Sequence, residues 1–325
     1  MDPTRILDFD GLQQQLWSFA AHRVITVAAR SGMLTLLAQR DGSAEEVAAA
    51  LELDPLATGK MLRALCALGL LRGDQGRFAV VDPLRPHFTP GPDDLVPFIE
   101  HSHVMYERWG ENLETWLRGQ PWQSTQAVSP DPGKFGAAMQ AMGSFIAQKV
   151  VAALDLRGVE RMLDIGGGFG HYARTFCRAR SGLQATVVDR PEVVELGRQQ
   201  VATSDLAGRV EFIGGDYLEV GYGQGYDLAL LANVLHQESA ERAADLVRRA
   251  TKALTRDGRL VVLDFAIDDA RQQQVLGALF AINMRSFGDT YPEPTLRAWF
   301  KAAGLRDVQR IDLPPHRWLI VGHKP

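Results

Sequence analysis

The stretch RMLDIGGGFG (Arg161–Gly170) decides the fold of this chain. Apolar residues around a single acid, Asp164, predict a buried strand that ends at Ile165. Three glycines then turn the chain, and Gly170 precedes a predicted helix over 171–179. Glycine admits positive φ and lets a ligand approach the main chain without meeting a Cβ. Because a helix N-terminus favours a negative group, the stretch predicts a site for a nucleotide-like cofactor.

Downstream of this stretch, predicted strands alternate with predicted helices, which is the pattern of a parallel sheet covered on both faces. The last two strands are joined by a tight turn at Pro314–Pro315 and are expected to be antiparallel. We therefore expect an α/β, doubly wound, Rossmann-like sheet whose final strand is reversed. Its seven strands are expected at 161–165, 185–189, 210–213, 227–231, 259–264, 307–312 and 317–321.

Three acids fall at successive strand ends, where such sheets bind ligands. Asp164 lies in the first strand, Asp189 ends the second and is expected to take two ribose hydroxyls, and Asp216 follows the third beside an adenine edge. The dinucleotide fingerprint also fits residues 168–173, with Asp189 as its acid, so a nicotinamide enzyme is the rival interpretation. Asp216, the reversed last strand and the two glycines before Gly168 favour another nucleotide-like cofactor.

The N-terminal part, residues 1–92, is expected to form a helical domain with the winged-helix pattern. Gly32 separates two amphipathic helices, and Ser43 with Glu46 forms a capping box ahead of another. The expected second helix of the motif carries only Lys60 and Arg63, and the net charge is −4, so nucleic acid is not the expected partner. The surplus apolar face of the first helices instead predicts a homodimer interface.

Residues 93–155 are expected to form a helical connector that contributes to a substrate pocket. Its helices are predicted over 95–117 and 135–154 and are rich in aromatic residues and methionine, which suit a flat aromatic ligand. His101 and His103 are two positions apart, which points them away from each other on a helix, so no metal site is expected.

Cysteine use and hydropathy bear on the compartment. Cys66 and Cys177 are far apart in sequence and are read as buried small hydrophobes, which fits a reducing cytoplasm. The first thirty residues contain no long apolar run, and no window approaches 18 consecutive apolar residues. We therefore expect a cytoplasmic protein with neither a signal peptide nor a membrane span.

The motifs resemble those of the S-adenosylmethionine-dependent small-molecule O-methyltransferases of the caffeate type and their bacterial relatives. The resemblance covers nearly the whole chain and implies a class I methyltransferase domain at 156–325, preceded by a winged-helix dimerisation domain. It implies S-adenosyl-L-methionine as methyl donor and S-adenosyl-L-homocysteine as product. The matching segments are the winged-helix module at 44–78, LDIGGGFG (163–170), VVDRPEVVE (187–195), GGDYLE (214–219), LANVLHQES (231–239), DGRLVVLDF (257–265) and FKAAGL (300–305).

The resemblance also assigns roles to residues. His236 follows the fourth strand and would be the base that takes the proton of the acceptor hydroxyl, with Asp264 as the carboxylate that orients it. The cofactor would contact Asp164, Gly166, Gly167, Gly168, Gly170, Asp189, Arg190, Asp216, Tyr217 and Asn233. The acceptor would contact Tyr106, Trp109, Met139, Met142, Phe145, Phe280, Asn283, Met284 and Phe287.

Two departures from the family pattern concern catalysis. Gln237 and Glu238 follow His236 where the family has Asp and Trp, so the ring expected to cover the adenine is missing, and Tyr217 or Phe265 would replace it. A further family acid is replaced by Thr290, and Glu293 is the carboxylate nearest to it in sequence.

We expect transfer of a methyl group to a hydroxyl of an aromatic or polyketide-like small molecule in specialised metabolism. Because the sulfonium leaves as a neutral thioether, no metal is needed. The alternatives are a C- or N-methyltransferase on the same scaffold, a family member that binds the cofactor but catalyses a non-methylating step, and a winged-helix regulator that senses a ligand.

Overall fold

The computed structural model describes residues 8–91, 93–120, 132–268, 274–284, 287–314 and 317–325. The chain divides into two compact units, Ile6–Met142 and Gly143–Pro325, each with its own hydrophobic core. The boundary between them falls inside the helix α6 (Pro132–Ala153). The division into three domains at residues 92 and 155 stays a prediction.

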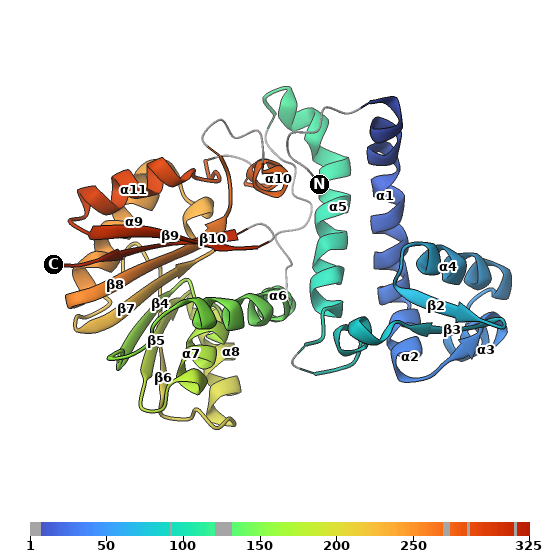
Figure 1. Cartoon of the computed structure of the whole chain (residues 1–325), viewed down its shortest axis with the longest axis horizontal. Helices are drawn as coiled ribbons and strands as arrows, with labels where there is room; N and C mark the ends of the chain where they lie inside the picture. Colours follow the sequence, from blue (N-terminus) through green and yellow to red (C-terminus); the bar gives the residue numbers. More distant parts are fainter. Residues whose placement is uncertain (1–7, 92, 121–131, 269–273, 285–286, 315–316) are drawn as a thin grey trace. The chain divides into compact units, whose positions relative to one another are not determined.

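The C-terminal unit is built on a seven-stranded sheet in the order β6-β5-β4-β7-β8-β10-β9 (Figure 1). The first five strands in this order are parallel to one another, and β10 runs antiparallel to both of its neighbours. The expected seven strands and the reversed last strand are therefore confirmed, although Pro315 of the connecting turn lies outside the described residues. The strands are β4 (Arg161–Ile165), β5 (Gln184–Asp189), β6 (Val210–Gly214), β7 (Tyr226–Ala232), β8 (Leu254–Phe265), β9 (Arg306–Leu313) and β10 (Arg317–His323).

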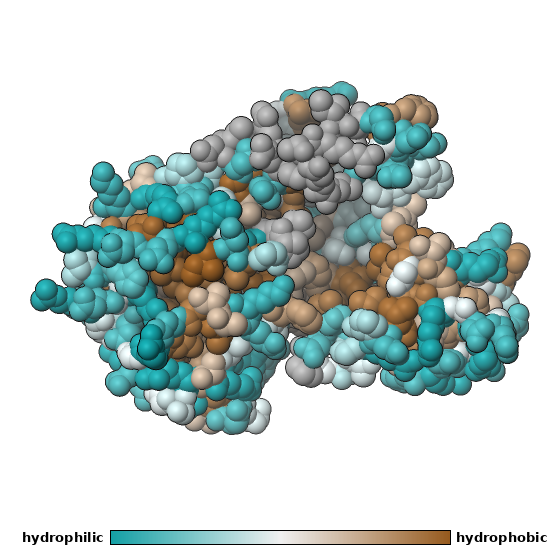
Figure 2. Space-filling model, viewed as in Figure 1, coloured by the Kyte–Doolittle hydropathy of each residue, from teal (hydrophilic) through white to brown (hydrophobic). Residues whose placement is uncertain are grey.

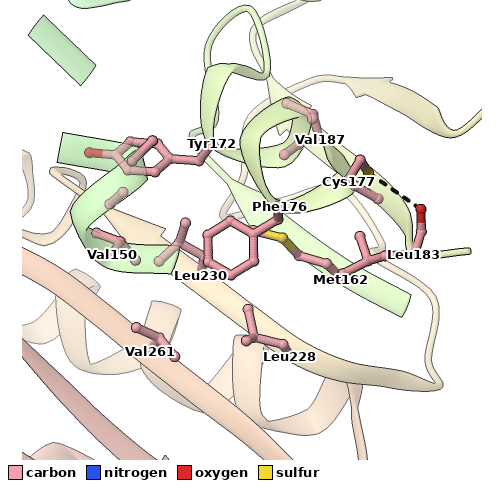
Figure 3. Close-up of a cluster of buried hydrophobic side chains, with 14 of the residues drawn as sticks. Val150, Met162, Tyr172, Phe176, Cys177, Leu183, Val187, Leu228, Leu230 and Val261 are labelled. Carbon is pink, nitrogen blue, oxygen red and sulfur yellow. Dashed lines mark hydrogen bonds between the residues drawn. The ribbon is translucent and has the colours of Figure 1, made fainter. Parts of the chain in front are cut away.

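Helices cover both faces of this sheet because apolar side chains alternate along its strands. In β4, Met162 belongs to the core cluster under one face and Leu163 to the cluster under the other. The first face is covered by the C-terminal part of α6 with α7 (His171–Ala179) and α8 (Pro191–Ala202), and the second by α9 (Ala240–Ala253) and α11 (Glu293–Ala302). Figure 3 shows Phe176 of α7 lying among Met162, Leu228 and Leu230 of the sheet.

The N-terminal unit combines helices with a three-stranded sheet in the order β1-β3-β2. Gly32, with φ of 83°, separates α1 (Phe9–Arg30) from α2 (Met33–Gln39), as the sequence predicts. The capping box of Ser43 and Glu46 is present at α3 (Ala44–Leu51), and Asp54 caps α4 (Pro55–Ala67). The strands are β1 (Gly42–Ser43), β2 (Leu71–Asp74) and β3 (Arg77–Val80), and η1 (Asp82–Phe88) and α5 (Val96–Leu117) follow. The N-terminal helical unit is confirmed, and its description as a winged helix stays a prediction.

Polar contacts join α1 and α5. Nη1 of Arg23 lies 2.7 Å from Nδ1 of His103, whose other ring nitrogen lies 3.2 Å from Glu107, while His101 packs edge-on against Phe135. The two histidines thus point to different partners, as their spacing predicts. Among the described residues, no group of three or more His, Cys, Asp or Glu side chains is arranged to hold a metal ion.

The surface seen in Figure 2 is largely hydrophilic on each unit, with apolar residues between the polar ones. Within the described part of the chain, every helix is too short or too polar to cross a membrane.

Candidate active site

The glycine loop between β4 and α7 has the conformation that its sequence predicts. Gly166, Gly168 and Gly170 all have positive φ, of 70°, 59° and 74°. A Cβ at Gly167 would lie 2.6 Å from Cγ of Asp164, so this position is glycine for internal packing. A Cβ at Gly168 would meet no atom within 4 Å. The main chain at Gly168 therefore faces open space, as a loop that admits a ligand requires.

Asp164 lies under this loop and is fully buried. Its Oδ2 accepts a hydrogen bond of 3.3 Å from the backbone N–H of Ala173 in the first turn of α7, while Oδ1 has no hydrogen-bond partner among the described residues. Burial raises the pKa of Asp164 to about 7. This oxygen is therefore available to accept a hydrogen bond from a ligand in the loop.

Asp189 is the last residue of β5, and its side chain forms a hydrogen bond with the same loop. Its Oδ2 accepts a hydrogen bond of 2.8 Å from the N–H of Gly168, and its Oδ1 accepts one of 2.8 Å from the N–H of Arg190. Burial raises the pKa of Asp189. The Arg190 guanidinium pairs with Glu192 at 3.4 Å on the surface, so the structure brings the backbone of Arg190 to the site.

Asp216 and Tyr217 follow β6 at the same edge of the sheet. Asp216 caps the turn after it, because its Oδ1 accepts a hydrogen bond of 2.8 Å from the N–H of Leu218. The Tyr217 hydroxyl donates to Oε1 of Glu238 at 2.6 Å. Burial, and next the hydrogen bond to Glu238, raise the pKa of Tyr217.

Glu238 holds the side chain of Tyr217 in place, which the sequence did not reveal. The side chain is buried, its Oε2 accepts from Nε of Arg242 at 2.5 Å, and its backbone carbonyl accepts from the Tyr291 hydroxyl at 2.6 Å. Where the family pattern has a tryptophan, this chain therefore has a buried carboxylate that fixes the ring of Tyr217. The signal available in the sequence was the i, i+4 spacing of Glu238 and Arg242, which favours an ion pair on a helix.

His236 and Asp264 form a buried pair, as the resemblance implied. His236 lies in the short helix η2 (Leu235–Gln237) after β7, and its Nδ1 is 2.6 Å from Oδ1 of Asp264 near the end of β8. Both side chains are buried, and Oδ1 of Asp264 also accepts a hydrogen bond of 2.8 Å from the N–H of Phe265. Because a carboxylate only accepts, Nδ1 carries the hydrogen, and Nε2 of a neutral ring is left as an acceptor.

Aromatic rings enclose this pair. The ring centroid of His236 lies 4.9 Å from that of Phe280 in α10 (Val275–Asn283) and 5.7 Å from that of Phe265. The two phenylalanine rings stack at 3.9 Å. The structure thus brings one predicted acceptor residue, Phe280, directly to the candidate base, and apolar rings exclude water from it.

The remaining acceptor residues are spread over both units. Tyr106, Trp109, Met139 and Met142 belong to the N-terminal unit, and their meeting with Phe280 at one acceptor stays a prediction. In the C-terminal unit, Asn283 ends α10, Met284 follows it, and the side chains of Phe145 and Phe287 are exposed.

The two positions that replace the further family acid serve the fold. Thr290 is buried, and its hydroxyl donates to the carbonyl of Gly277 at 3.2 Å. The Glu293 carboxylate is held by Arg297 at 2.6 Å and by Arg310 at 3.0 Å. Glu293 is therefore already neutralised by two cations at the start of α11.

Asn233 lies between the loop and the base and has a partner that sequence reasoning missed. Its backbone adopts a φ of 57°, and its N–H donates to the carbonyl of Leu263 at 2.8 Å. Its side-chain oxygen accepts a hydrogen bond from Arg317, whose guanidinium carbon lies 4.1 Å from the ring centroid of Phe265. No local pattern marked Arg317, which follows the sequence Pro314-Pro315-His316.

These features fit a nucleoside cofactor with a small amino-acid end. The backbone is open at Gly168, a buried oxygen of Asp164 lacks a donor, and Asp189 and Asp216 stand at successive strand ends. A sheet with a reversed last strand, this loop and an adjacent His–Asp pair define a methyltransferase of the S-adenosylmethionine-dependent class. Residues 112–306 match the O-methyltransferase domain family, and the chain belongs to that family.

Known proteins are similar along nearly the whole chain. A 3-hydroxy-5-methyl-1-naphthoate 3-O-methyltransferase from Streptomyces sahachiroi is 27% identical, over 95% of this chain and 91% of the relative. An N,N-dimethyltransferase (OxyT) from Streptomyces rimosus is 28% identical, over 97% of this chain and 96% of the relative. The structure of human N-acetylserotonin methyltransferase has the same fold, with a TM-score of 0.85, 24% identity and coverage of 100% of this chain and 99% of that one.

Family membership confirms the resemblance seen in the motifs and the Rossmann-like methyltransferase fold. The chain is therefore a methyltransferase whose methyl donor is S-adenosyl-L-methionine. The nicotinamide interpretation of the glycine loop is set aside.

Proposed function

We propose that this enzyme transfers the methyl group of S-adenosylmethionine to a hydroxyl of an aromatic or polyketide-like small molecule in specialised metabolism, with His236 as the general base. The observation that carries the proposal is the 2.6 Å contact between His236 and Asp264, buried beside the stacked rings of Phe265 and Phe280. The naphthoate relative, whose named acceptor is aromatic, supports the acceptor class.

The proposed chemistry follows from the orientation of the imidazole. Asp264 fixes the hydrogen of His236 on Nδ1, so Nε2 accepts the proton of the acceptor hydroxyl as its oxygen attacks. Asp264 then stabilises the imidazolium without taking the proton itself. The bound cofactor supplies a methyl group on a sulfonium and leaves as S-adenosylhomocysteine. Phenylalanine rings around the pair keep water away and hold a flat acceptor in place.

The cofactor residues are likewise a proposal. The glycine loop from Gly166 to Gly170, with Asp164 below it, would hold the methionine part, and Asp189 would bind the ribose hydroxyls. Asp216 and Tyr217 would contact the adenine, with Glu238 holding the Tyr217 ring in place of the missing tryptophan. Arg190 and Asn233 line the same strand ends.

A methylation assay with a matched control tests the proposal. Purified enzyme is incubated with S-adenosylmethionine and a panel of hydroxyarenes, and methylated product and S-adenosylhomocysteine are quantified by mass spectrometry. His236→Ala should lower kcat by about 10²–10⁴ while the Kd for S-adenosylhomocysteine stays unchanged. His323→Ala, at the far end of β10, serves as the control and should keep full activity. Equal activity of both variants would refute the role of His236.

A second candidate function is N-methylation, favoured by the similarity to an N,N-dimethyltransferase. A C- or N-acceptor is already nucleophilic and needs less help from a base, so His236→Ala would then keep much of its activity. NMR of the product locates the methyl group and separates these cases. Product that forms without S-adenosylhomocysteine would show a non-methylating step, and salt-sensitive binding to duplex DNA would show a regulator.

We further propose that the enzyme is a homodimer formed through the N-terminal unit. Along α1, large apolar side chains are exposed, among them Leu16 and Trp17, each at 65%. An exposed stripe of this kind is typical of a protein interface. Light scattering should give a dimer for the wild type and a monomer for the double variant Leu16→Glu/Trp17→Glu, whereas a wild-type monomer would refute the proposed dimer.

We also propose a cytoplasmic location. Both cysteines are free, which supports a reducing compartment.

A further inference from the structure

Arg317 reaches the edge of the sheet that carries the glycine loop. It begins β10 and pairs with Phe265, the last residue of β8. Because β10 runs against β8, its beginning lies at the edge where the parallel strands end. Side chains alternate along β10, so Arg317 shares a face with Leu319 and Val321, which is the face covered by α7.

Within the described part of the chain, the guanidinium of Arg317 makes no ion pair, and the charge of the buried Asp264 acts on it only from a greater distance. Its hydrogen bond to Asn233 and its stacking on Phe265 engage a neutral amide and a ring, and no carboxylate of the described residues lies within ion-pair distance. Burial lowers the pKa of Arg317. A half-buried guanidinium normally pairs with an anion, because an unpaired charge is costly to remove from water.

Arg310 on the same hairpin shows the contrast. Its guanidinium carbon lies 4.4 Å from the ring centroid of Trp318, which is the stacking that Arg317 makes with Phe265. Arg310 also pairs with Asp312 at 2.6 Å and with Glu293 at 3.0 Å. Two stacked arginines of one hairpin thus differ in that only Arg310 has carboxylates from the described part of the chain.

A second polar group, the hydroxyl of Tyr172, lies near Arg317. The Tyr172 hydroxyl is buried without a hydrogen bond of good geometry, and the polar side chain that acts on it is that of Asn233, the residue that Arg317 also contacts. Burial raises the pKa of Tyr172, and the charge of Arg317 acts on it in the opposite direction, so the two groups are electrostatic neighbours. Tyr172 lies in the first turn of α7, whose N-terminus favours an anion. A cation, a buried hydroxyl and a helix N-terminus therefore act on one region.

We propose that Arg317 is the cation of a carboxylate-binding subsite, with Tyr172 and Asn233 beside it, at the edge of the sheet that carries His236. The planar guanidinium suits two parallel hydrogen bonds to one carboxylate. The inference rests on the proposed function, because the carboxylate belongs to a ligand of methyl transfer. That carboxylate is either the one at the amino-acid end of the cofactor or an acid group on the acceptor.

Calorimetric binding to the full-length protein separates these sources. The first arm compares S-adenosylhomocysteine with its decarboxylated analogue, 5′-deoxy-5′-(3-aminopropylthio)adenosine. The second compares 3-hydroxy-1-naphthoate with 2-naphthol on protein saturated with S-adenosylhomocysteine. The variants are Arg317→Met and Arg317→Lys, with Arg310→Met as the stacked control, and thermal melting confirms that each variant is folded.

If the carboxylate is that of the cofactor, Arg317→Met should weaken the binding of S-adenosylhomocysteine by about 10- to 100-fold, as for loss of a charge-assisted hydrogen bond. The binding of the decarboxylated analogue should be unchanged. If the carboxylate is that of the acceptor, Arg317→Met should cause the same loss of affinity for the naphthoate alone. Arg317→Lys should lie between wild type and Arg317→Met, and Arg310→Met should match wild type. The subsite would be overturned if Arg317→Met bound each carboxylate ligand as well, relative to its uncharged analogue, as the wild type does. It would also be overturned if neither the wild type nor the variants bound the naphthoate and the affinity for S-adenosylhomocysteine were unchanged. Failure of the wild type to bind S-adenosylhomocysteine would instead refute the proposed function.

Discussion

Replacing Asp264 by asparagine should lower kcat about tenfold without weakening cofactor binding. Oδ1 of Asp264 accepts from both His236 Nδ1, at 2.6 Å, and the Phe265 N–H, at 2.8 Å. An amide oxygen in the same place accepts both hydrogen bonds, so the tautomer of His236 is kept and only the negative charge is lost. A charge-assisted hydrogen bond contributes about 1.5–3 kcal/mol and a neutral one about 0.5–1.5 kcal/mol. The midpoints of these ranges differ by about 1.25 kcal/mol, which corresponds to nearly a factor of ten in rate.

The assay is steady-state methyl transfer with calorimetry for S-adenosylhomocysteine. Asp264→Ala should lower kcat further, by about 10² or more, because it leaves the imidazolium without a partner in a buried site. The order wild type, then Asp264→Asn, then Asp264→Ala is the result that supports electrostatic stabilisation of the imidazolium. Wild-type kcat in Asp264→Asn, or a loss of cofactor affinity equal to the loss of kcat, would contradict the reasoning.

Three further predictions concern packing, protonation and the adenine side of the site. Gly143→Ala should lower the free energy of unfolding by about 1–3 kcal/mol, although alanine is the better helix former, because its Cβ would lie 2.0 Å from Nε2 of His171. Urea titration should show that His171→Ala added to Gly143→Ala restores most of this loss. Asp164 has a folded-state pKa of about 7 against an ordinary value of 3.8, so its contribution to stability is full below pH 4 and is lost as the pH rises to 7. The difference in unfolding free energy between wild type and Asp164→Asn should therefore fall over that interval, and a constant difference would contradict the raised pKa. Glu238→Ala should weaken the binding of S-adenosylhomocysteine about tenfold, because the Tyr217 ring is then no longer held. Glu238→Gln still accepts the 2.6 Å hydrogen bond and should weaken this binding less. Equal dissociation constants for the two variants in calorimetry would refute this role of Glu238.

Much of the fold was predictable because it is encoded in local patterns. The strand before the glycine loop, the break at Gly32 and the capping box at Ser43 each depend on residues within a few positions, and all three are confirmed. The reversed last strand was predictable from the tight turn that precedes it. Predicting these features requires no information on contacts between residues far apart in the sequence.

The site was predictable only where a motif named its residues. The pairing of His236 with Asp264 came from the resemblance, since 28 positions separate them and no local pattern joins them. Glu238 and Arg317 were missed because a charged residue in sequence is normally solvent-exposed. Their hydrogen-bond partners, Tyr217 and Asn233, stand 21 and 84 positions away in the sequence, so no local pattern joins them.

The direction of β10 also determines which edge of the sheet a label on this strand would reach. Its first residue, Arg317, lies beside Phe265 at the ligand edge, whereas its last, His323, pairs with Arg259 at the opposite edge. The two ends of β10 therefore lie at opposite edges of the sheet, although Arg317 and His323 are only six positions apart. A label attached close to His323 would therefore lie at the edge opposite the ligand edge, whereas one attached at Arg317 would lie on the ligand edge itself.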